Sequence, residues 1–320
     1  PGESMVVHLD ETTTTAGVPT PVWIQIQDAF GNPLILGSAD RELLTFGDDD
    51  GAVSCTPTGS DIFERRYLYD CQFLIAGRDR RLFVASPSMG VLGSSAPIEV
   101  VPGALANVVS TLDREDIRDG VEAGDAIDIA VEGLDSWGNR VSGTHLLAIQ
   151  SVGGGMIPTN VELSDGTGLL MASPQTAILG ESVWFFHAGV AMGGTESFDV
   201  WAGPPDGIHA WIQEPWGYTG ELKMVHVTLV DEFGNWTHGE PRALSVSSRG
   251  SLADDFTGLV SDHTSAPLTF HSAGIGDSID IEVEEWSHTI ENVDVAHYCG
   301  ALDGEGLGAA AHADGRICLP

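Results

Sequence analysis

Three kinds of residue in this sequence could carry chemistry: a run of carboxylates, a group of tryptophans and four cysteines. The carboxylates are Asp48, Asp49 and Asp50, which stand directly before a glycine. Aspartate oxygens are hard ligands of the kind that calcium prefers, so the run is a candidate calcium site. A hydrated β-turn is the simpler interpretation, because the acidic run lacks the alternating spacing and the distant glutamate of a standard calcium loop.

The tryptophans gather in the last third of the chain, where Trp211, Trp216 and Trp236 lie within one short stretch. A row of aromatic rings on a sheet can stack on sugars or bury a partner chain. The alternative is that these rings belong to a core and its corners. We keep the three as candidate binding residues, with a glycan as one candidate ligand.

The four cysteines fall into two local pairs, Cys55 with Cys71 and Cys299 with Cys318. Neither pair has Cys-x-x-Cys spacing, and no histidine cluster completes a zinc site. We therefore expect two disulfides and an oxidising compartment, against the alternative of four reduced core cysteines.

No catalytic constellation is recognisable. The sequence has no Gly-x-Ser-x-Gly motif, and its glycine-rich stretch at 151–156 precedes neither a predicted helix nor a lysine. Glu284 and Glu285 are adjacent in a predicted strand, so they point to opposite faces and cannot act together. We expect a protein that is not an enzyme and has no cofactor other than the candidate calcium ion.

The charge balance is strongly acidic, with 47 acidic against 13 basic residues and a formal net charge of −34. Such a chain lacks the lysines and arginines that bind nucleic acid or an anionic lipid surface. No apolar stretch reaches the roughly 18–20 residues that a membrane-spanning helix needs. The chain begins with Pro1 rather than methionine, which fits export through a cleaved signal to the cell surface or beyond.

The elements that position these residues are indicated by a motif that occurs three times, Asp-x-aromatic-Gly-Asn. Apolar residues with a period of two precede each copy, as at Val22 and Ile24, and predict a half-buried strand. An aspartate followed three residues later by glycine is typical of a tight turn whose Asp side chain binds the backbone ahead. The predicted structural turn residues are Asp28, Gly31, Asn32, Asp135, Gly138, Asn139, Asp231, Gly234 and Asn235. Asn235 also opens an Asn-Trp-Thr glycosylation triplet.

The copies lie roughly 100 residues apart, which is the size of one β-sandwich. Apolar runs that end in Ala-Gly recur downstream of the turns, at 73–77, 185–189 and 270–274. The segments between repeats, "VVPGALA" and "AGPPDG", are short and contain proline, so we expect a semi-rigid rod. The predicted divisions are repeat one at 1–102, repeat two at 103–205, repeat three at 206–299, and a disulfide-bracketed tail at 300–320.

Two segments, "TAGVPTPVWIQIQDAFGNPL" at 15–34 and "EAGDAIDIAVEGLDSWGNRV" at 122–141, resemble bacterial immunoglobulin-like repeats. Such modules occur in invasin- and intimin-type surface proteins. The resemblance covers roughly residues 1–299 and implies an all-β fold of three tandem immunoglobulin-like sandwiches. It leaves the function open, because these modules serve as spacers, adhesins and polymer subunits.

We therefore expect a non-enzymatic extracellular protein with a structural or adhesive role. It would be a subunit or segment of a surface fibre that binds to itself or to a neighbouring surface protein. The alternative is a carbohydrate-binding or accessory module of a secreted protein.

One segment suggests a route of assembly. Residues 207–213 form the only strand-like run between "FDVWAG" and "GELKMVHVTLVD", so we expect them to serve one repeat and leave the other with an open sheet edge. An open edge can accept a strand from another chain, and residues 1–15 are the natural donor. Head-to-tail strand addition of this kind does not close on itself and grows a filament.

Overall fold

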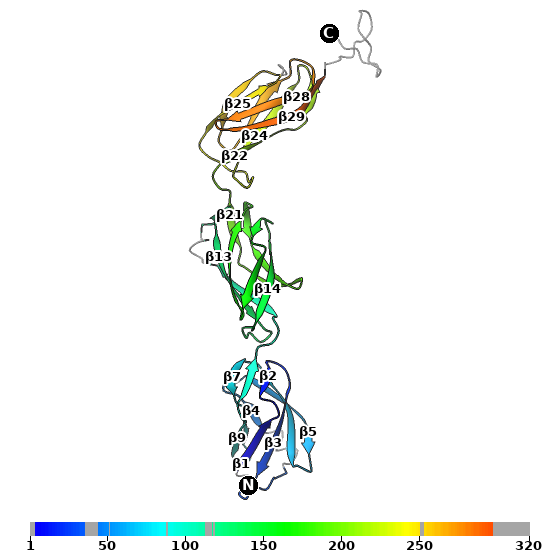
Figure 1. Cartoon of the computed structure of the whole chain (residues 1–320), viewed down its shortest axis with the longest axis vertical. Coiled ribbons are helices and arrows are strands. Elements are labelled where there is room, and N and C mark those ends of the chain that lie inside the picture. The colour runs from blue at the N-terminus through cyan, green and yellow to red at the C-terminus, as the bar shows by residue number, and fades with distance from the viewer. Residues whose placement is uncertain are drawn as a thin grey trace, which may run out of the picture.

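The computed structural model describes residues 4–35, 44–50, 52–87, 89–112, 117, 119–249 and 253–296. All the secondary-structure elements assigned within these residues are β-strands, and the strands form three sandwiches in a row (Figure 1). Each sandwich has its own hydrophobic core. The prediction of an all-β fold with three tandem immunoglobulin-like sandwiches is confirmed.

Repeat one has two facing layers. The first is the sheet β1-β3-β6-β5, and the second consists of the sheets β2-β10-β7 and β4-β8-β9. Ile24, Phe73 and Leu82 are fully buried between them. The strands are β1 Ser4–Leu9, β2 Thr13–Thr15, β3 Thr20–Gln27, β4 Thr45–Gly47, β5 Val53–Asp61, β6 Arg66–Phe73, β7 Gly77–Arg80, β8 Phe83–Ser86, β9 Val91–Ser94 and β10 Ile98–Val101.

Repeat two folds around Ile129, Leu163 and Phe185, all fully buried. Its large sheet has the order β11-β13-β17-β16-β14-β19-β20, and its small sheet the order β12-β21-β18. The strands are β11 Asn107–Leu112, β12 Val121–Glu122, β13 Ile127–Leu134, β14 Thr144–Ser151, β15 Met156–Ile157, β16 Asn160–Ser164, β17 Thr167–Pro174, β18 Ile178–Glu181, β19 Val183–His187, β20 Val190–Gly194 and β21 Phe198–Trp201.

Repeat three packs the sheet β22-β24-β27 against the sheet β23-β29-β28-β25-β26. Leu229, Phe270 and Ile281 are fully buried in its core. The strands are β22 Gly207–Ile212, β23 Trp216–Tyr218, β24 Leu222–Val230, β25 Arg242–Ser248, β26 Phe256–Val260, β27 His263–Thr269, β28 Gly274–Val283 and β29 Trp286–Ala296.

The three repeats share a local plan. The strands before the first two motifs, β3 and β13, bury alternate residues, as the period of two predicted. The third, β24, buries Val225, Val227 and Leu229 in the same way, and Thr228 between them is buried as well. In each repeat a short strand also pairs in parallel with the last strand, β2 with β10, β12 with β21 and β23 with β29. Equivalent positions in the three repeats can therefore be assigned from backbone pairing rather than from residue identity.

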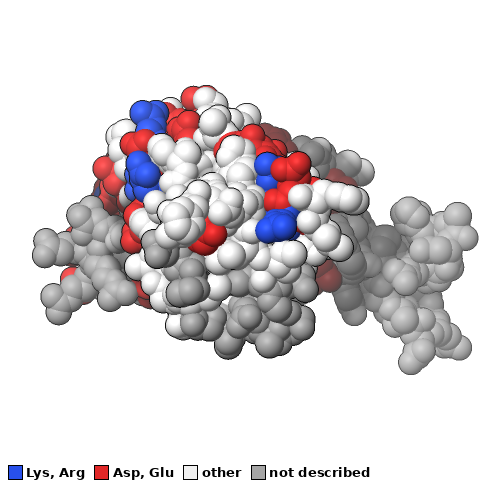
Figure 2. All heavy atoms as spheres, turned by 90° about the horizontal axis from the view of Figure 1, so that it is seen from below, with Lys and Arg blue, Asp and Glu red and all other residues white. Residues whose placement is uncertain are grey.

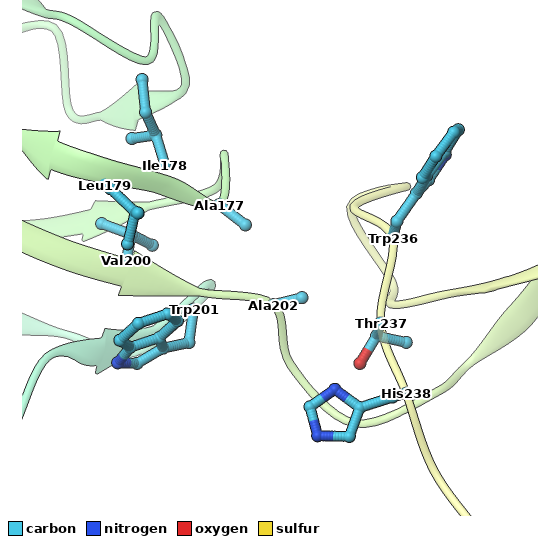
Figure 3. Close-up of a pocket in the computed structure, with 9 residues that line it drawn as sticks. All are labelled: Ala177, Ile178, Leu179, Val200, Trp201, Ala202, Trp236, Thr237 and His238. Carbon is cyan, nitrogen blue, oxygen red and sulfur yellow. The ribbon is translucent and has the colours of Figure 1, made fainter. Parts of the chain in front are cut away.

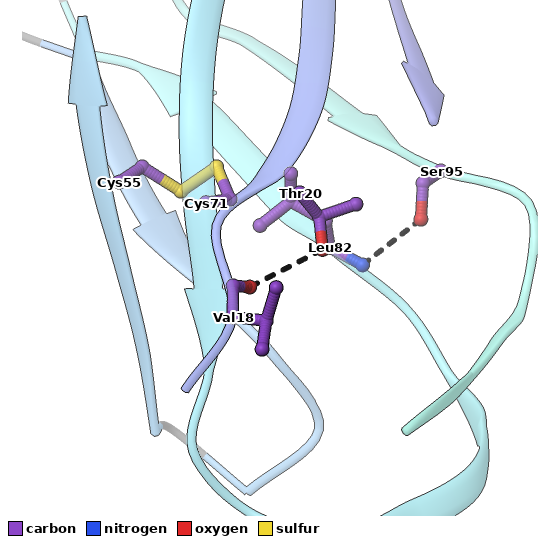
Figure 4. Close-up of a disulfide and its surroundings, with 6 residues drawn as sticks. All are labelled: Val18, Thr20, Cys55, Cys71, Leu82 and Ser95. Carbon is purple, nitrogen blue, oxygen red and sulfur yellow. Dashed lines mark hydrogen bonds between the residues drawn. A yellow bond between two sulfur atoms is a disulfide. The ribbon is translucent and has the colours of Figure 1, made fainter. Parts of the chain in front are cut away.

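A disulfide links the neighbouring strands β5 and β6 of repeat one (Figure 4). Cys55 stands directly opposite Cys71 in the strand register, and the predicted bond between them is present. Beside it the Leu82 amide donates to Ser95 Oγ at 3.0 Å. The second predicted pair, Cys299 with Cys318, and the tail at 300–320 lie outside the described residues.

The expected shortage of strands between repeats two and three is wrong. The run "FDVWAG" supplies β21, which pairs with β12 and β18 and completes repeat two. Gly207–Ile212 forms β22, which pairs with β24 and opens repeat three. The predicted strand donor is also engaged, because β1 pairs with β3 along its whole length. The shortage of strands from which the open edge was inferred is therefore absent from the described part of this boundary.

Candidate functional site

Each Asp-x-aromatic-Gly-Asn turn is closed by its own aspartate. In repeat two, Asp135 Oδ1 accepts the backbone amides of Trp137 at 2.8 Å and Asn139 at 2.9 Å. Equivalent bonds of 2.9 Å link Asp28 to Phe30 and Asn32, and Asp231 to Phe233 and Asn235. The glycines in the motifs, Gly31, Gly138 and Gly234, adopt positive φ angles of 78°, 84° and 84°. These contacts give the three turns one shape.

The turn of repeat two lies against repeat one. Asn139 Nδ2 donates to the carbonyl oxygen of Leu74 at 2.8 Å, and Asn139 Oδ1 accepts the amide of Ala76 at 2.9 Å. The side-chain amide of Asn139 thus donates one hydrogen bond and accepts one, in the way that a backbone peptide group of a neighbouring strand does. Two hydrogen bonds cross this boundary, which we call joint one.

The turn of repeat three makes the same pair of bonds to repeat two, at joint two. Asn235 Nδ2 donates to the Gln175 carbonyl at 2.8 Å, and Asn235 Oδ1 accepts the Ala177 amide at 2.9 Å. The turn at Asp28 and Asn32 has no sandwich against it among the described residues (Figure 1). The motif is therefore used as a connector between repeats, a role that the sequence did not indicate.

The receiving ends of repeats one and two are equivalent. The carbonyl of Phe73 accepts the amide of Gly17 at 2.8 Å, and that of Pro174 accepts the amide of Gly124 at 2.7 Å. The residues that follow, 74–76 and 175–177, therefore occupy the same place. The expectation that the Ala-Gly run at 185–189 corresponds to 73–77 is wrong, because residues 183–187 form β19 inside the large sheet.

An aromatic ring covers a glycine at each joint. A Cβ atom on Gly17 would lie 2.0 Å from Trp137 Nε1, and one on Gly124 would lie 2.6 Å from Phe233 Cε2. Both glycines also have positive φ angles, 77° and 95°. The ring of the motif rests directly on backbone at these positions, so only glycine fits beneath it.

The aspartates also hold the segment between repeats. Asp135 Oδ2 accepts the Gly103 amide at 2.8 Å, and Asp231 Oδ2 accepts the Gly203 amide at 2.9 Å. Asp135 is only 3% exposed. Burial alone would raise its pKa, but hydrogen bonds from the Asn139 side chain and from backbone amides, including that of Gly103, outweigh burial and hold the pKa below 3.8. The pKa of Asp231 is lowered by the same balance.

Two of the three candidate tryptophans come together. The rings of Trp211 and Trp236 stack with centroids 5.9 Å apart and an angle of 19° between their planes. Trp211 also stacks with His226 at 5.2 Å. Trp216 lies in β23 near the far end of repeat three, where it meets Tyr218 edge-on at 6.3 Å. The predicted aromatic row is thus divided between two places.

A cleft at joint two contains further rings. Ala177, Leu179 and Trp201 line it from repeat two, while Trp236 and His238 line it from repeat three (Figure 3). The sequence did not indicate this cleft, because its two walls come from different repeats.

Histidines gather near the aromatic pair. His226 stacks with His263 at 5.5 Å, and His209 approaches His288 at 6.1 Å. Burial lowers the pKa of His288 below 6.5, and the neighbouring His209 lowers it further. Across the described residues, no group of three or more His, Cys, Asp or Glu side chains is arranged to hold a metal ion.

Asp48, Asp49 and Asp50, the candidate calcium ligands, therefore do not form such a group. Asp48 Oδ1 accepts two backbone amides of its own turn, and Asp50 pairs with Arg80. Asp49 accepts the amide of Arg81 at 3.1 Å. The three side chains are spread over separate partners instead of converging on one point.

Three sandwiches linked by one repeated joint define a tandem array of immunoglobulin-like repeats. No family model matches the sequence, and no curated protein matches it. Among the described residues, no helix is long and apolar enough to cross a bilayer.

Several solved structures are similar to the chain at low identity. The adhesin FdeC of Escherichia coli is 17% identical over 92% of this chain and 98% of that one, with a TM-score of 0.39. Invasin, a bacterial integrin-binding protein, is 15% identical over 92% of this chain and 60% of that one, with a TM-score of 0.32. Domains 1–6 of the surface layer protein SbsC are 14% identical over 99% of this chain and 44% of that one, with a TM-score of 0.29.

Proposed function

We propose that this chain is a non-enzymatic extracellular protein with a structural and adhesive role, a stiff segment or subunit of a surface fibre. The observation that carries the proposal is the joint, which the chain builds twice from the same atoms. The Cys55–Cys71 disulfide is consistent with the oxidising environment outside the cell.

The joints convert three sandwiches into a rod. Domains joined only by a linker are expected to move relative to one another. Here two hydrogen bonds cross each boundary, a ring rests on a glycine, and the linker amide is bound by a buried aspartate. Each neutral hydrogen bond contributes about 0.5–1.5 kcal/mol, so the bonds together favour one inter-repeat angle. A rod of this kind holds whatever it carries at a fixed distance.

Growth of a fibre by head-to-tail contact requires that two chains associate through their ends. Strand addition would require β1 to leave β3, with which it pairs over all six of its residues. Contact between intact ends has no such cost. We therefore propose that the fibre grows by docking of whole ends in place of strand exchange.

Small-angle X-ray scattering and negative-stain electron microscopy of the full chain test the rod. We expect straight particles with a narrow distribution of lengths at low protein concentration. Compact particles, or particles bent over a wide range of angles, would contradict a stiff rod. Scattering over a range of salt concentrations serves as a control, because the bonds at the joints are short-range and resist screening.

A second candidate function, glycan binding, is favoured by the stacked pair of Trp211 and Trp236. The Trp236 ring is 64% exposed, and an exposed indole ring is a suitable surface for a sugar ring. A glycan array with the full chain and with Trp236→Ala tests this candidate. Trp216→Ala is the matched control, because it removes the same ring from the other end of the repeat. Binding that is lost with Trp236→Ala alone would support a carbohydrate-binding role, and an array without signals would reject it.

A further inference from the structure

We infer that the two ends of the rod are complementary, so that the turn of repeat one in one copy docks on the far end of repeat three in a second copy. The inference rests on the proposed function and identifies the partner as another copy of this chain. It follows from comparing each free end with the two joints already formed.

The turn of repeat one is a connector without a partner among the described residues. Asp28 closes it with the same two bonds as in the other repeats. The Asn32 side chain is exposed, and among the described residues its Nδ2 donates only to the Asp28 carboxylate, at 3.1 and 3.2 Å. Phe30, the counterpart of Phe233, is 89% exposed. The turn is thus already shaped for the contact that its counterparts make.

The described atoms at the same end of the rod carry little charge at its centre. Figure 2, a view from below Figure 1, shows that these atoms are mainly uncharged, with most acidic and basic groups toward the edges. The chain as a whole carries a net charge of −34. The described surface of this end is therefore better suited to contact another acidic copy than a strongly charged surface would be.

The far end of repeat three has the geometry of a receiving end. The amide of Gly220 donates to the Phe270 carbonyl at 2.7 Å, as Gly17 does to Phe73 and Gly124 to Pro174. The His271 carbonyl and the Ala273 amide therefore occupy the places of the atoms that bind Asn139 and Asn235. Gly220 also has a positive φ angle of 84°. A Cβ atom on Gly220 would meet no described atom within 4 Å, so none of the described side chains covers this glycine as Trp137 covers Gly17.

An apolar groove marks the same end. It is lined by Trp216, Tyr218, Ala273, Ile275 and Ala296. Ile275 is 90% exposed and Trp216 is 52% exposed.

The groove corresponds to the half of the joint-two cleft that repeat two contributes. Ala273 and Ile275 occupy the positions of Ala177 and Leu179. Ala296 corresponds to Trp201, because each lies in the last strand of its repeat and its carbonyl accepts the amide of the residue before the glycine, Thr219 or Ala123. At joint two, residues of the next repeat complete the cleft. No described residue does so at the end of repeat three.

A second copy supplies the missing half. Its Asn32 amide would pair with the His271 carbonyl and the Ala273 amide, and its Phe30 ring would cover Gly220. Phe30 has the same side chain as Phe233, which covers Gly124 in the formed joint. The two complementary surfaces lie at opposite ends of the rod (Figure 1), so the contact is heterologous and extends into a filament. Two separate copies have no covalent linker between them, whereas a linker supplies an effective concentration of about 1 mM in tethered pairs. We therefore expect the association to be weak and to require concentrated protein.

The test uses full-length chains with one end blocked. Phe30→Asp with Asn32→Ala blocks the donor end, and Ala273→Glu with Ile275→Asp blocks the receiving end. All four side chains are exposed, so the variants should fold. Sedimentation velocity is measured for each protein over a concentration series up to about 1 mM. The series reaches this concentration because a weak contact has a Kd of about 1 mM. We expect the unmodified chain to form a ladder of oligomers and each variant to remain monomeric.

Mixing the two variants gives the decisive result. Each variant keeps one functional end, so an equimolar mixture should form dimers and nothing larger. Raising the salt concentration should strengthen association of the unmodified chain, because salt screens the repulsion between acidic rods. Monomers at every concentration, assembly of the blocked variants, or failure of the mixture to form dimers would overturn the inference.

Scattering from the monomeric variants separates the two proposals. Straight monomers that never associate would overturn end docking and leave the proposed rod intact. Bent monomers would overturn the rod itself.

Discussion

The side-chain oxygen of Asn235 accepts the backbone amide of Ala177 at 2.9 Å, across the boundary between two sandwiches. Asn139 and Ala76 form the same bond at the same distance one repeat earlier. One asparagine side chain per boundary therefore sets the position of each sandwich on the one before it.

Replacing these asparagines should loosen the rod. Asn139→Ala and Asn235→Ala each remove two bonds across a joint, and each bond contributes about 0.5–1.5 kcal/mol. We expect a wider distribution of inter-repeat angles in electron micrographs and little change in the unfolding of the individual sandwiches. Asn32→Ala is the matched control, because this asparagine has the same place in its turn and no bond to another repeat. Rods as straight as the unmodified chain would contradict the role of the joint.

Glycine substitutions separate contact from backbone strain. Gly124→Ala places a methyl group 2.6 Å from the Phe233 ring and also strains a positive φ angle. Gly220→Ala imposes similar strain, at φ 84°, in open space. We expect both to lower the free energy of unfolding by about 1 kcal/mol through the backbone, with only Gly124→Ala opening a joint. Chemical denaturation and scattering measure the two effects, and equal scattering from both variants would argue against ring-on-glycine packing.

Much of the fold follows from local patterns. Alternation before Asp28, Asp135 and Asp231 predicts the strands because side chains on a strand alternate between two faces, and the Asp-Gly spacing predicts the turns because an Asx side chain binds nearby amides. Both rules involve residues a few positions apart.

The joints are not predictable in this way. Asn139 binds backbone atoms of Leu74 and Ala76. Because almost every residue has a backbone carbonyl and an N–H, the amino-acid sequence does not reveal which ones bind the asparagine. The residues of repeat two that receive the next turn, 175–177, share only one alanine with 74–76, so residue identity favours the Ala-Gly run at 185–189 instead. The pairing of Trp211 with Trp236 depends likewise on the register of β22 against β24.

The pH dependence of the joints follows from the lowered pKa of Asp135 and Asp231. A folded-state pKa below the unfolded value of 3.8 means that the folded chain binds fewer protons. The stabilisation is therefore complete above about pH 4 and is lost as the pH falls through the folded value. Urea titrations between pH 3 and pH 7 should show this loss. Asp135→Asn should reduce the change of the free energy of unfolding with pH. It should also lower that free energy by about 1–3 kcal/mol, because an amide NH2 would then face the N–H of Gly103. An unchanged slope would contradict this account.

His288 should produce a second dependence at higher pH. Its folded pKa is lower than 6.5, so its contribution to stability is present above that value and is lost as the pH falls below it. Each unit of depression corresponds to about 1.4 kcal/mol. His288→Gln should flatten the stability of repeat three between pH 5 and pH 7. His271→Gln is the control, because that histidine is exposed and lies 2.9 Å from Asp254. If the free energy of unfolding of His288→Gln still changed with pH between pH 5 and pH 7, the pH dependence would come from a group other than His288.

Glycosylation at Asn235 should be incompatible with joint two. Both hydrogens of its side-chain amide are used, by the Gln175 carbonyl and by Asp231 Oδ2, each at 2.8 Å. The threonine of the triplet, Thr237, is buried and donates to the Gly203 carbonyl at 2.6 Å. A glycan replaces one amide hydrogen, so a chain modified at Asn235 cannot keep both bonds.

Expression in a host that attaches N-linked glycans tests this prediction. We expect modified molecules, identified by mass spectrometry, to bend at joint two in micrographs. A matched control places a triplet on the free turn by Pro33→Ser with Leu34→Thr, so that Asn32 becomes the acceptor. Asn32 binds no other repeat, and a glycan there should leave the rod straight while blocking end-to-end association. Straight rods with a fully occupied Asn235 would show that the joint tolerates loss of its asparagine bond, and the connecting role would then pass to the aromatic ring and the linker.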